Sequence, residues 1–505
     1  MESLSLAYKL LIVGWLVVLI WVPYVIYTNK KIHPKALFVL FFAELWERFS
    51  YYGMRALLVL YMIDVGAELS YEKSQAYAIY GAYGAMVYAT PLLGGLIAEK
   101  FFGYRNSILW GGILMALGHF TMAFPLISEL GIGSPESIHA LSEPMFFIAL
   151  GLLILGNGFF KPNISSFVGT FYKENSELRD RGFNLFYMGI NIGAFLGALT
   201  VGAVAAKYGW HYGFGLAGIG MAIGQLVYFY GLQYLEGVGE FIGSDKSPDK
   251  ELMNKPLTKV EKDRMLVMFL SFLIIIVFWG AFEQAGGLMS LYTEQKTDRM
   301  LSFSLPFIGN EVPAAIFQSI NAFFIIIFAT AVAYFWTKWA NKGKESSSLF
   351  KMAVGLIIMA FGFFFMSKAS TEVEVVESWV KWEPDEIVQK SAMIWLVLAY
   401  LFHTIGELCA SPVALSFITK LAPVKYAAFM MGAYFAATGL GNKVAGFVGQ
   451  LSEGAGEFQV FTGIAIFCTL FGILVLLLLK PLKRLTHGAE EKNVEIAQSA
   501  KLKNE

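Results

Sequence analysis

The feature that most constrains this chain is a row of charges within an apolar helix, predicted from about Pro34 to Ile63. The row reads Glu44-Leu45-Trp46-Glu47-Arg48-Phe49-Ser50-Tyr51-Tyr52-Gly53-Met54-Arg55. At about 100° per residue, its four ionisable side chains and Tyr51 fall on roughly a third of the helix circumference, with Tyr52 at the edge. A charge at the centre of a membrane span costs about 2.5–3.5 kcal/mol on insertion scales, so these charges must pair or face water. We therefore predict that the stripe lines an interior path.

A purely structural ion pair is the alternative interpretation of this row. Glu44 and Arg48 are four residues apart, in the order that favours pairing on a helix. That pair leaves Glu47 and Arg55 without partners. We expect these two side chains to find partners on other helices.

The composition is that of a membrane protein with many spans. Of 505 residues, 57% are hydrophobic and 15% charged, and the mean hydropathy is +0.59, too apolar for a soluble chain. The formal net charge is zero and Lys and Arg are dispersed, which argues against a nucleic-acid partner. Cys409 and Cys468 lie in apolar runs and the six His lack metal-ligand spacing, so we expect no disulfide, metal or other cofactor.

Apolar runs predict twelve spans in two sets of six, after one extra N-terminal helix. The extra helix, at about 8–27, is interpreted as retained rather than as a cleaved signal peptide, because most of its positive charge follows the apolar run. The twelve spans are predicted at about 34–63, 73–99, 105–128, 144–172, 181–206, 210–235, 263–295, 313–340, 349–367, 388–420, 425–451 and 457–480. The predicted divisions are the extra helix at 1–30, a six-helix bundle at 31–235, a linker at 236–262, a second bundle at 263–484 and a polar tail at 485–505.

Basic residues orient these spans, because positively charged loops stay in the cytoplasm. The loop after the second span has Lys100 and Arg105, and both the linker and the loop at 338–344 are rich in Lys. The loop at 129–143 has three Glu and no Lys or Arg. The linker, the tail and both ends of the twelve-span core are then predicted to be cytoplasmic, and residue 1 to lie outside the cell membrane.

Two six-helix halves joined by a cytoplasmic linker are typical of major facilitator superfamily transporters, whose substrate site lies near the midplane between the halves. The stretch 94–105 resembles the motif of that superfamily between spans 2 and 3, with Glu99 where Asp is usual. The predicted fold class is therefore an all-α membrane protein with the major facilitator superfamily fold and one extra N-terminal transmembrane helix.

Ionisable residues within the predicted spans fall on four helices that could face one cavity. They are Glu44, Glu47, Arg48 and Arg55 in the first span, Lys161 in the fourth, Glu283 in the seventh and Glu407 in the tenth. Arg55 and Lys161 on one wall would bind a carboxylate, and Glu407 on the other would bind an ammonium group. This complementarity to a zwitterion favours small peptides or amino acids as substrates.

Aromatic residues around these charges offer apolar walls with hydrogen-bonding edges. They are Tyr52, Tyr83, Tyr88, Tyr187, Trp279 and Tyr434. For Tyr83 and Tyr434, packing or a place at the membrane interface is the favoured interpretation.

Amides and prolines complete the pattern. Asn191 and Asn321 lie in mid-helix, where amides more often join helices than bind ligands. Pro162, directly after Lys161, and Pro412 in the stretch Glu407-Leu408-Cys409-Ala410-Ser411-Pro412 permit bends beside the charges. Ser411 in that stretch is predicted to line the substrate site.

The row in the first span resembles the helix-1 signature of the proton-dependent oligopeptide transporter family. Phe186-Tyr187-Met188-Gly189-Ile190-Asn191-Ile192-Gly193-Ala194 is similar to the helix-5 signature of that family, and Lys161-Pro162-Asn163 and Phe278-Trp279 with Phe282-Glu283-Gln284 add to the match. The resemblance covers about residues 33–480.

This resemblance implies a role for each matching residue. Glu44, Glu47, Arg48 and Lys161 would form the proton-coupling cluster, and Arg55 with Lys161 would hold the carboxylate of the peptide. Glu407, Asn191 and Asn321 would hold its amino terminus. Tyr52, Tyr88, Tyr187 and Trp279 would line the pocket, and Glu283 would pair with Arg55 in the outer gate.

Two departures from the family pattern bear on these roles. Some relatives have a His in helix 2 after an Ile-Tyr pair, whereas here Gly81 follows Ile79-Tyr80, so proton coupling would depend on the acids of the first span. Helix 11 often has Trp where this chain has Tyr434, which would change the size of the pocket.

The resemblance implies a symporter that imports di- and tripeptides with protons by alternating access, as a monomer in the lipid bilayer and with the proton as its only coupling ion. The first alternative is a transporter of the same fold that carries nitrate or a drug-like anion. Glu407 argues against it, because a site for a simple anion needs no acidic side chain to bind an ammonium group. A membrane enzyme is disfavoured because no metal-ligand, nucleophile or phosphate-loop motif is found. A non-transporting sensor is disfavoured by the short tail.

Overall fold

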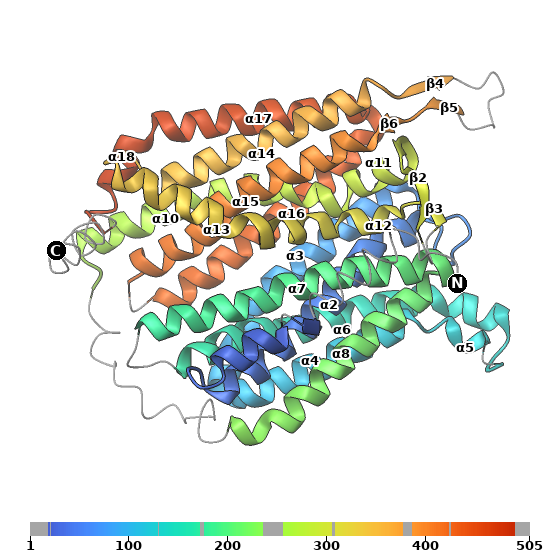
Figure 1. Ribbon diagram of the computed structural model, residues 1–505, viewed down its shortest axis with the longest axis horizontal. Helices are drawn as coiled ribbons and strands as arrows, with labels where there is room; N and C mark the ends of the chain where they lie inside the picture. Colours follow the sequence, from blue (N-terminus) through green and yellow to red (C-terminus); the bar gives the residue numbers. More distant parts are fainter. Residues whose placement is uncertain are drawn as a thin grey trace.

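The computed structural model describes residues 19–20, 22–129, 131–171, 176–235, 256–305, 309–376, 386–423 and 426–489. Within these residues, twelve helices of 20 or more residues lie along one common direction (Figure 1). They are α2 (Lys35–Ile63), α3 (Lys73–Ile97), α4 (Gly103–Met122), α6 (Pro135–Thr170), α7 (Ser176–Tyr208), α8 (Trp210–Gly231), α10 (Lys259–Phe282), α13 (Ser319–Asn341), α14 (Ser348–Ser370), α15 (Met393–Leu421), α16 (Ala427–Ala455) and α17 (Glu457–Leu477). Eight helical segments in the described residues are long and apolar enough to cross a membrane.

Each predicted span corresponds to one of these helices, but the bounds of several differ. Helix α6, which corresponds to the span predicted at 144–172, begins earlier than predicted, at Pro135. The span at 263–295 is broken: α10 gives way to a 3₁₀ turn, η4 (Glu283–Gly286), before the short helix α11 (Leu288–Lys296). The span at 313–340 likewise begins with a separate turn, α12 (Ala314–Phe317).

Short strands at one end of the helices were not predicted. β1 (Thr297–Asp298) pairs in parallel with β6 (Ser391–Ala392), β2 (Met300–Leu305) pairs with β3 (Gly309–Glu311), and β4 (Glu374–Val376) pairs with β5 (Glu386–Gln389). The predicted helix start at residue 388 was therefore wrong, because β5 and β6 occupy that stretch and α15 begins at Met393. Between β1 and β2, Arg299 forms ion pairs of 2.9 Å with Glu294 and 2.8 Å with Glu311.

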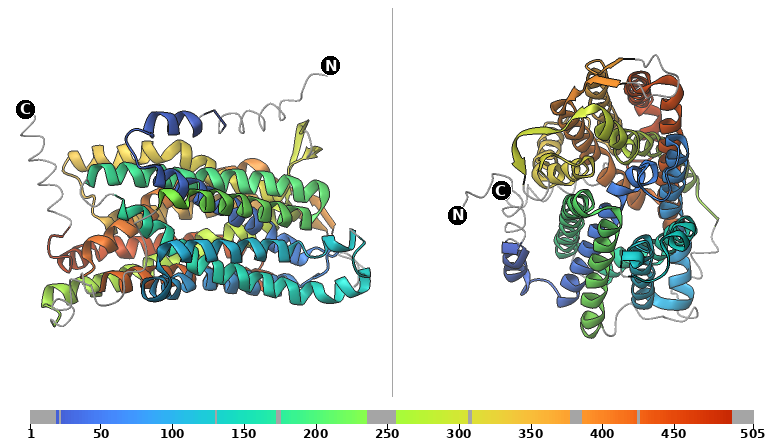
Figure 2. Two further views of the ribbon diagram at one scale, coloured as in Figure 1. Left: turned by 90° about the horizontal axis from the view of Figure 1, so that it is seen from below. Right: turned by 90° about the vertical axis from the view of Figure 1, so that its right-hand side faces the viewer.

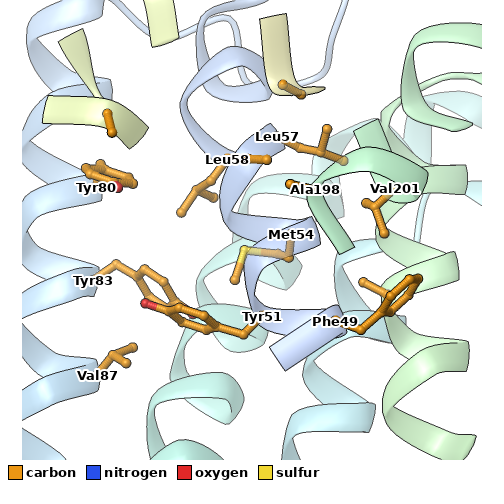
Figure 3. Close-up of a cluster of buried hydrophobic side chains, with 14 of the residues drawn as sticks. Phe49, Tyr51, Met54, Leu57, Leu58, Tyr80, Tyr83, Val87, Ala198 and Val201 are labelled. Carbon is orange, nitrogen blue, oxygen red and sulfur yellow. The ribbon is translucent and has the colours of Figure 1, made fainter. Parts of the chain in front are cut away.

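Helix α2 is the centre of the first group of helices, because it packs against α7, α8 and α3. Figure 3 shows side chains of α2, among them Met54 and Leu58, between Tyr83 and Val87 of α3 and Val201 of α7. Close approach of α7 depends on glycine: a Cβ on Gly193 or Gly197 would collide with the backbone of α2 at Leu45 or Phe49. The charged helix is therefore held by direct backbone contact.

The second group is arranged around α14, which packs against α15 and α17, while α10 packs against α16. The two groups lie on opposite sides when the molecule is viewed along its helices (Figure 2, right). They meet where α3 packs against α16 and where α7 packs against α13 and α12. These two seams therefore position the walls of any site between the groups.

Three predicted segments fall largely outside the described residues, among them the polar tail at 485–505, of which residues 490–505 are not described. Of the extra helix predicted at 8–27, residues 19–20 and 22–27 are helical, and the helix continues to residue 29. Of the predicted linker at 236–262, residues 236–255 lie outside the described residues. The start of α10 is defined by a capping box, in which Thr258 and Glu261 each bind the backbone N–H of the other.

Gly81 provides a test of the seam between α3 and α16. A Cβ at Gly81 would lie 2.9 Å from Cα of Gly446 and 3.1 Å from the carbonyl oxygen of Asn442. We expect Gly81→Ala to lower the stability of this packed conformation by about 1–3 kcal/mol through overpacking. Thermal unfolding of the purified protein measures this. Gly463→Ala in α17 is the matched control, since nothing lies within 4 Å of its Cβ position; equal unfolding temperatures for the two variants would contradict the prediction.

Candidate functional site

A cavity of about 1260 Å³ lies between the two groups of helices. At one end it is bounded by Arg55 and Glu283, which are 7% and 3% exposed. At the opposite end its lining includes exposed side chains such as Ser166, Thr419 and Phe429. The cavity is therefore closed at the Arg55 end and lined by accessible residues at the other.

Three buried charges of α2 form one cluster beside this cavity. Arg48 Nε lies 2.8 Å from Glu44 Oε1, to which it donates a hydrogen bond, and 2.5 Å from Glu47 Oε2. Glu47 is fully buried, and Asn157 of α6 donates to its other oxygen at 3.4 Å. The Glu44–Arg48 ion pair of the alternative interpretation is thus present, but Arg48 is shared with Glu47, whose charged partner was expected on another helix and lies on α2 itself. The cluster has two acids for one base, and Glu44 and Arg48 line the cavity.

The closed end of the cavity is held by three side chains from three helices. Arg55 Nη2 of α2 lies 2.6 Å from Glu283 Oε2 in η4, and Arg55 Nε donates to the hydroxyl oxygen of Tyr80 in α3 at 2.9 Å. The Tyr80 hydroxyl in turn donates to Glu283 Oε2 at 3.2 Å. A Cβ at Gly286 would collide with the Tyr80 hydroxyl, so the glycine in η4 permits this approach. We call Arg55, Tyr80 and Glu283 the gate triad.

Lys161 of α6 stands apart from both sets of acids. Its Nζ lies 4.1 Å from the ring centroid of Tyr88, which is the geometry of a cation–π contact. No carboxylate of the described residues lies within ion-pair distance of this ammonium group, although Arg48, Glu47 and Glu44 are near enough for their charges to act on it. Lys161 therefore lines the cavity as a cation whose countercharge is incomplete.

Across the cavity, Glu407 of α15 is held by an amide. Asn321 of α13 donates to Glu407 Oε2 at 2.9 Å and lies 3.0 Å from Oγ1 of Thr404. The Asn321 amide fixes one carboxylate oxygen, so the carboxylate is positioned on the wall opposite Lys161. Within the described residues, no group of His, Cys, Asp or Glu is arranged to hold a metal ion.

Comparison with known proteins places the chain in a family. The model of the POT family, the proton-dependent oligopeptide transporters, matches residues 105–240 and 243–462. The chain belongs to the POT family. The di-/tripeptide transporter of Lactococcus lactis subsp. lactis (strain IL1403) is 31% identical over 510 residues, which cover 90% of this chain and 96% of that protein.

Solved POT structures share the fold. The crystal structure of a peptide transporter POT in complex with sulfate has a TM-score of 0.76 and 30% identity, covering 90% of this chain and 96% of that one. A POT family transporter in complex with a thioalcohol-conjugated peptide has a TM-score of 0.76 and 26% identity, covering 89% and 97%. The chain is thus a multi-pass membrane protein of a transporter family, with the predicted major facilitator superfamily fold.

The structure brings most of the predicted site residues together around one cavity. All of them except Glu47 and Tyr88 line it: Glu44, Arg48, Tyr52, Arg55, Lys161, Tyr187, Asn191, Trp279, Glu283, Asn321, Glu407 and Ser411. Glu47 and Tyr88 lie directly behind it, in contact with Arg48 and Lys161. Asn191 donates to the Tyr187 carbonyl oxygen of its own helix. Tyr83 and Tyr434 are buried and do not line the cavity.

Sequence reasoning missed three polar residues at this POT site: Tyr80 in the gate triad, Asn157 on Glu47, and Thr404 beside Asn321. Asn157 directly follows Gly156 and lies four residues before Lys161, so it shares a helix face with the lysine. That spacing was the signal available for Asn157. Tyr80 was noted only as the neighbour of Gly81, and its role requires the contact between α2, α3 and η4.

Tyr80→Phe tests the gate triad. Loss of the hydroxyl leaves Arg55 Nε without its partner, and hydrogen bonds to charged groups contribute about 1.5–3 kcal/mol. We expect the closed end to open in a larger fraction of molecules. Spin labels at Glu72→Cys and Glu453→Cys, two exposed sites near the cross-group hydrogen bonds of Gln450 to Ser74, report this by pulsed electron paramagnetic resonance. Native Cys409 and Cys468 are buried.

The expected result is a longer-distance population that is larger than in the parent protein. Tyr230→Phe is the control, because its ring is 71% exposed on α8. An unchanged distance distribution in Tyr80→Phe would show that the hydroxyl does not hold the gate.

Proposed function

We propose that this POT protein imports di- and tripeptides together with protons by alternating access. The observation that carries the proposal is the charge arrangement of the cavity: Lys161 lines one wall without an ion-pair partner among the described residues, and an oriented Glu407 lines the other. A zwitterionic backbone with separated ends fits this arrangement. The names of the relatives support the same cargo, since one is a di-/tripeptide transporter and another was solved with a peptide conjugate.

The proposed contacts differ between the two ends of the peptide. Glu407, with Asn321 and Asn191, would bind the ammonium end, while the aromatic residues of the cavity would contact the side chains. In this conformation Arg55 is occupied by Glu283 and Tyr80, so Lys161 is the cation available to the carboxylate end. Arg55 would join Lys161 only when the gate triad opens. The affinity for the carboxylate would then be highest while the gate is open.

Proton coupling would use the cluster on α2. A proton taken up by Glu44 or Glu47 while the gate is open would remove one negative charge beside Lys161 and leave the lysine free to bind the peptide. Loss of that proton on the other side would return a carboxylate for Lys161 to approach, and the peptide would lose a ligand. The coupling depends on a general property of carboxylates, whose proton affinity changes when a nearby cation moves.

The proposed topology follows the positively charged loops. The linker at 236–262 and the tail at 485–505 would be cytoplasmic, joining bundles at 31–235 and 263–484, and residue 1 would lie outside the cell membrane. The accessible end of the cavity would then face the cytoplasm. Each chain holds a whole cavity between its own two groups of helices, which supports function as a monomer.

The experiment that tests this function is uptake of labelled dialanine into proteoliposomes with and without an inward proton gradient. We expect uptake that requires the gradient and that is strongly reduced by Glu407→Gln, which keeps the hydrogen-bonding shape but removes the charge. Glu374→Gln, at an exposed β4 residue, is the matched control and should transport normally. If folded protein takes up no di- or tripeptide, or if Glu407→Gln transports as the parent does, the cargo assignment is wrong.

A further inference from the structure

A second cavity, of about 440 Å³, opens on the outer surface of the second group of helices. Its apolar lining comes from three neighbouring helices: Val332, Trp336 and Trp339 of α13, Phe350 and Val354 of α14, and Ile405 of α15. Figure 1 shows these three helices next to one another. Neighbouring side chains such as Phe335 and Tyr334 are 51% and 66% exposed, so the cavity lies on a lipid-facing surface.

The aromatic rings around this cavity are fixed by polar contacts at their edges. Trp339 Nε1 donates to the Glu345 carbonyl oxygen at 2.9 Å, and Trp336 Nε1 donates to Cys409 Sγ at 3.4 Å. Their apolar faces are therefore held in place rather than free to fill the space. An apolar hollow of this size on a lipid-facing surface loses dispersion contacts unless an acyl chain enters it.

Positive charge is concentrated at one end of the cavity. Lys344 Nζ lies 4.2 Å from the Trp339 ring, Lys351 Nζ lies 5.5 Å from the Trp336 ring, and Lys338 and Lys342 are exposed nearby. The one acid in this loop, Glu345, already pairs with Lys483 at 2.9 Å. Among the described residues, no carboxylate forms an ion pair with Lys338, Lys342 or Lys344.

We propose that this cavity is a binding site for an anionic phospholipid, with one acyl chain between α13, α14 and α15 and the phosphate at Lys342 and Lys344. The acyl chain alone gives no preference, because every bilayer lipid offers one. The lysines supply the selectivity, because basic residues beside membrane-spanning helices attract anionic headgroups. An occupant would fill a space that borders Cys409, two residues from Glu407, and so would contact the helix that carries the peptide-binding acid.

Native mass spectrometry of the purified full chain in a neutral detergent tests this proposal. The protein is titrated with dioleoyl phosphatidylglycerol or dioleoyl phosphatidylcholine, which share their chains and differ in headgroup charge. We expect one phosphatidylglycerol to bind at least tenfold more tightly than phosphatidylcholine. Glycerol 3-phosphate, which has the anion without chains, should not bind. Equal binding of the two lipids, or equivalent binding of glycerol 3-phosphate, would overturn the proposal.

Two variants test the two parts of the proposed site, the lysines that would bind the phosphate and the apolar cavity that would hold the acyl chain. Lys342→Gln with Lys344→Gln should weaken phosphatidylglycerol binding by about 25-fold, about fivefold for each lysine. Lys30→Gln with Lys31→Gln, which removes two other exposed lysines, is the charge-matched control and should bind phosphatidylglycerol normally.

Val354→Phe should fill the cavity and reduce binding of phosphatidylglycerol, whereas Ile466→Phe on the exposed face of α17 should not reduce it. Equal effects of site and control variants would show that binding occurs elsewhere.

Discussion

The structure depends on placing charge inside an apolar helix without leaving it unpaired. Arg48 contacts both Glu44 and Glu47, and Arg55 contacts Glu283 and Tyr80, so every charge of the α2 stripe has an opposite charge within 2.8 Å. The cost of burying a single charge in a membrane span is large enough that these contacts are required for α2 to exist where it does. They also force α2 to the centre of the fold, because its partners come from α3, α6 and η4.

Two sets of charges lie on α2: the cluster of Glu44, Glu47 and Arg48, and Arg55 of the gate triad. The two sets differ in which helices supply their partners. The charges of the Glu44, Glu47 and Arg48 cluster all come from α2, and Asn157 of α6 adds a hydrogen bond, so none of these contacts crosses between the two groups of helices. The gate triad joins α2 to a segment of the second group, so it exists only while the closed end of the cavity is closed. Among the described residues, the close contact of Lys161 is the aromatic ring of Tyr88. The proposed exchange of protons and peptide uses this difference. The Glu44, Glu47 and Arg48 cluster would hold the proton, and the gate triad would form or break as the gate closes or opens.

Much of the fold could be predicted from the sequence, because long apolar runs and the stripe on α2 follow directly from helical periodicity. The bounds of α2 were predicted within a residue. Strands β1–β6 could not be predicted, since they are two to six residues long and depend on pairing between distant segments such as Thr297 and Ser391.

The charged residues of the site could be predicted from the sequence, because charges within apolar spans are rare. Tyr80 and Thr404 were not predicted, because an uncharged polar residue in a helix acquires its role only from partners on other helices. The contact of the Lys161 ammonium group with Tyr88 was not predicted either, for the same reason.

The central claim is that a carboxylate of the α2 cluster carries the proton that drives transport. Glu47→Gln tests this most directly, because Glu47 is fully buried and its replacement keeps the shape of the cluster. The measurement compares dialanine uptake driven by a proton gradient with counterflow, which exchanges labelled for unlabelled peptide without a gradient. The account predicts that the variant loses gradient-driven uptake and keeps counterflow. Full gradient-driven uptake by Glu47→Gln would contradict it.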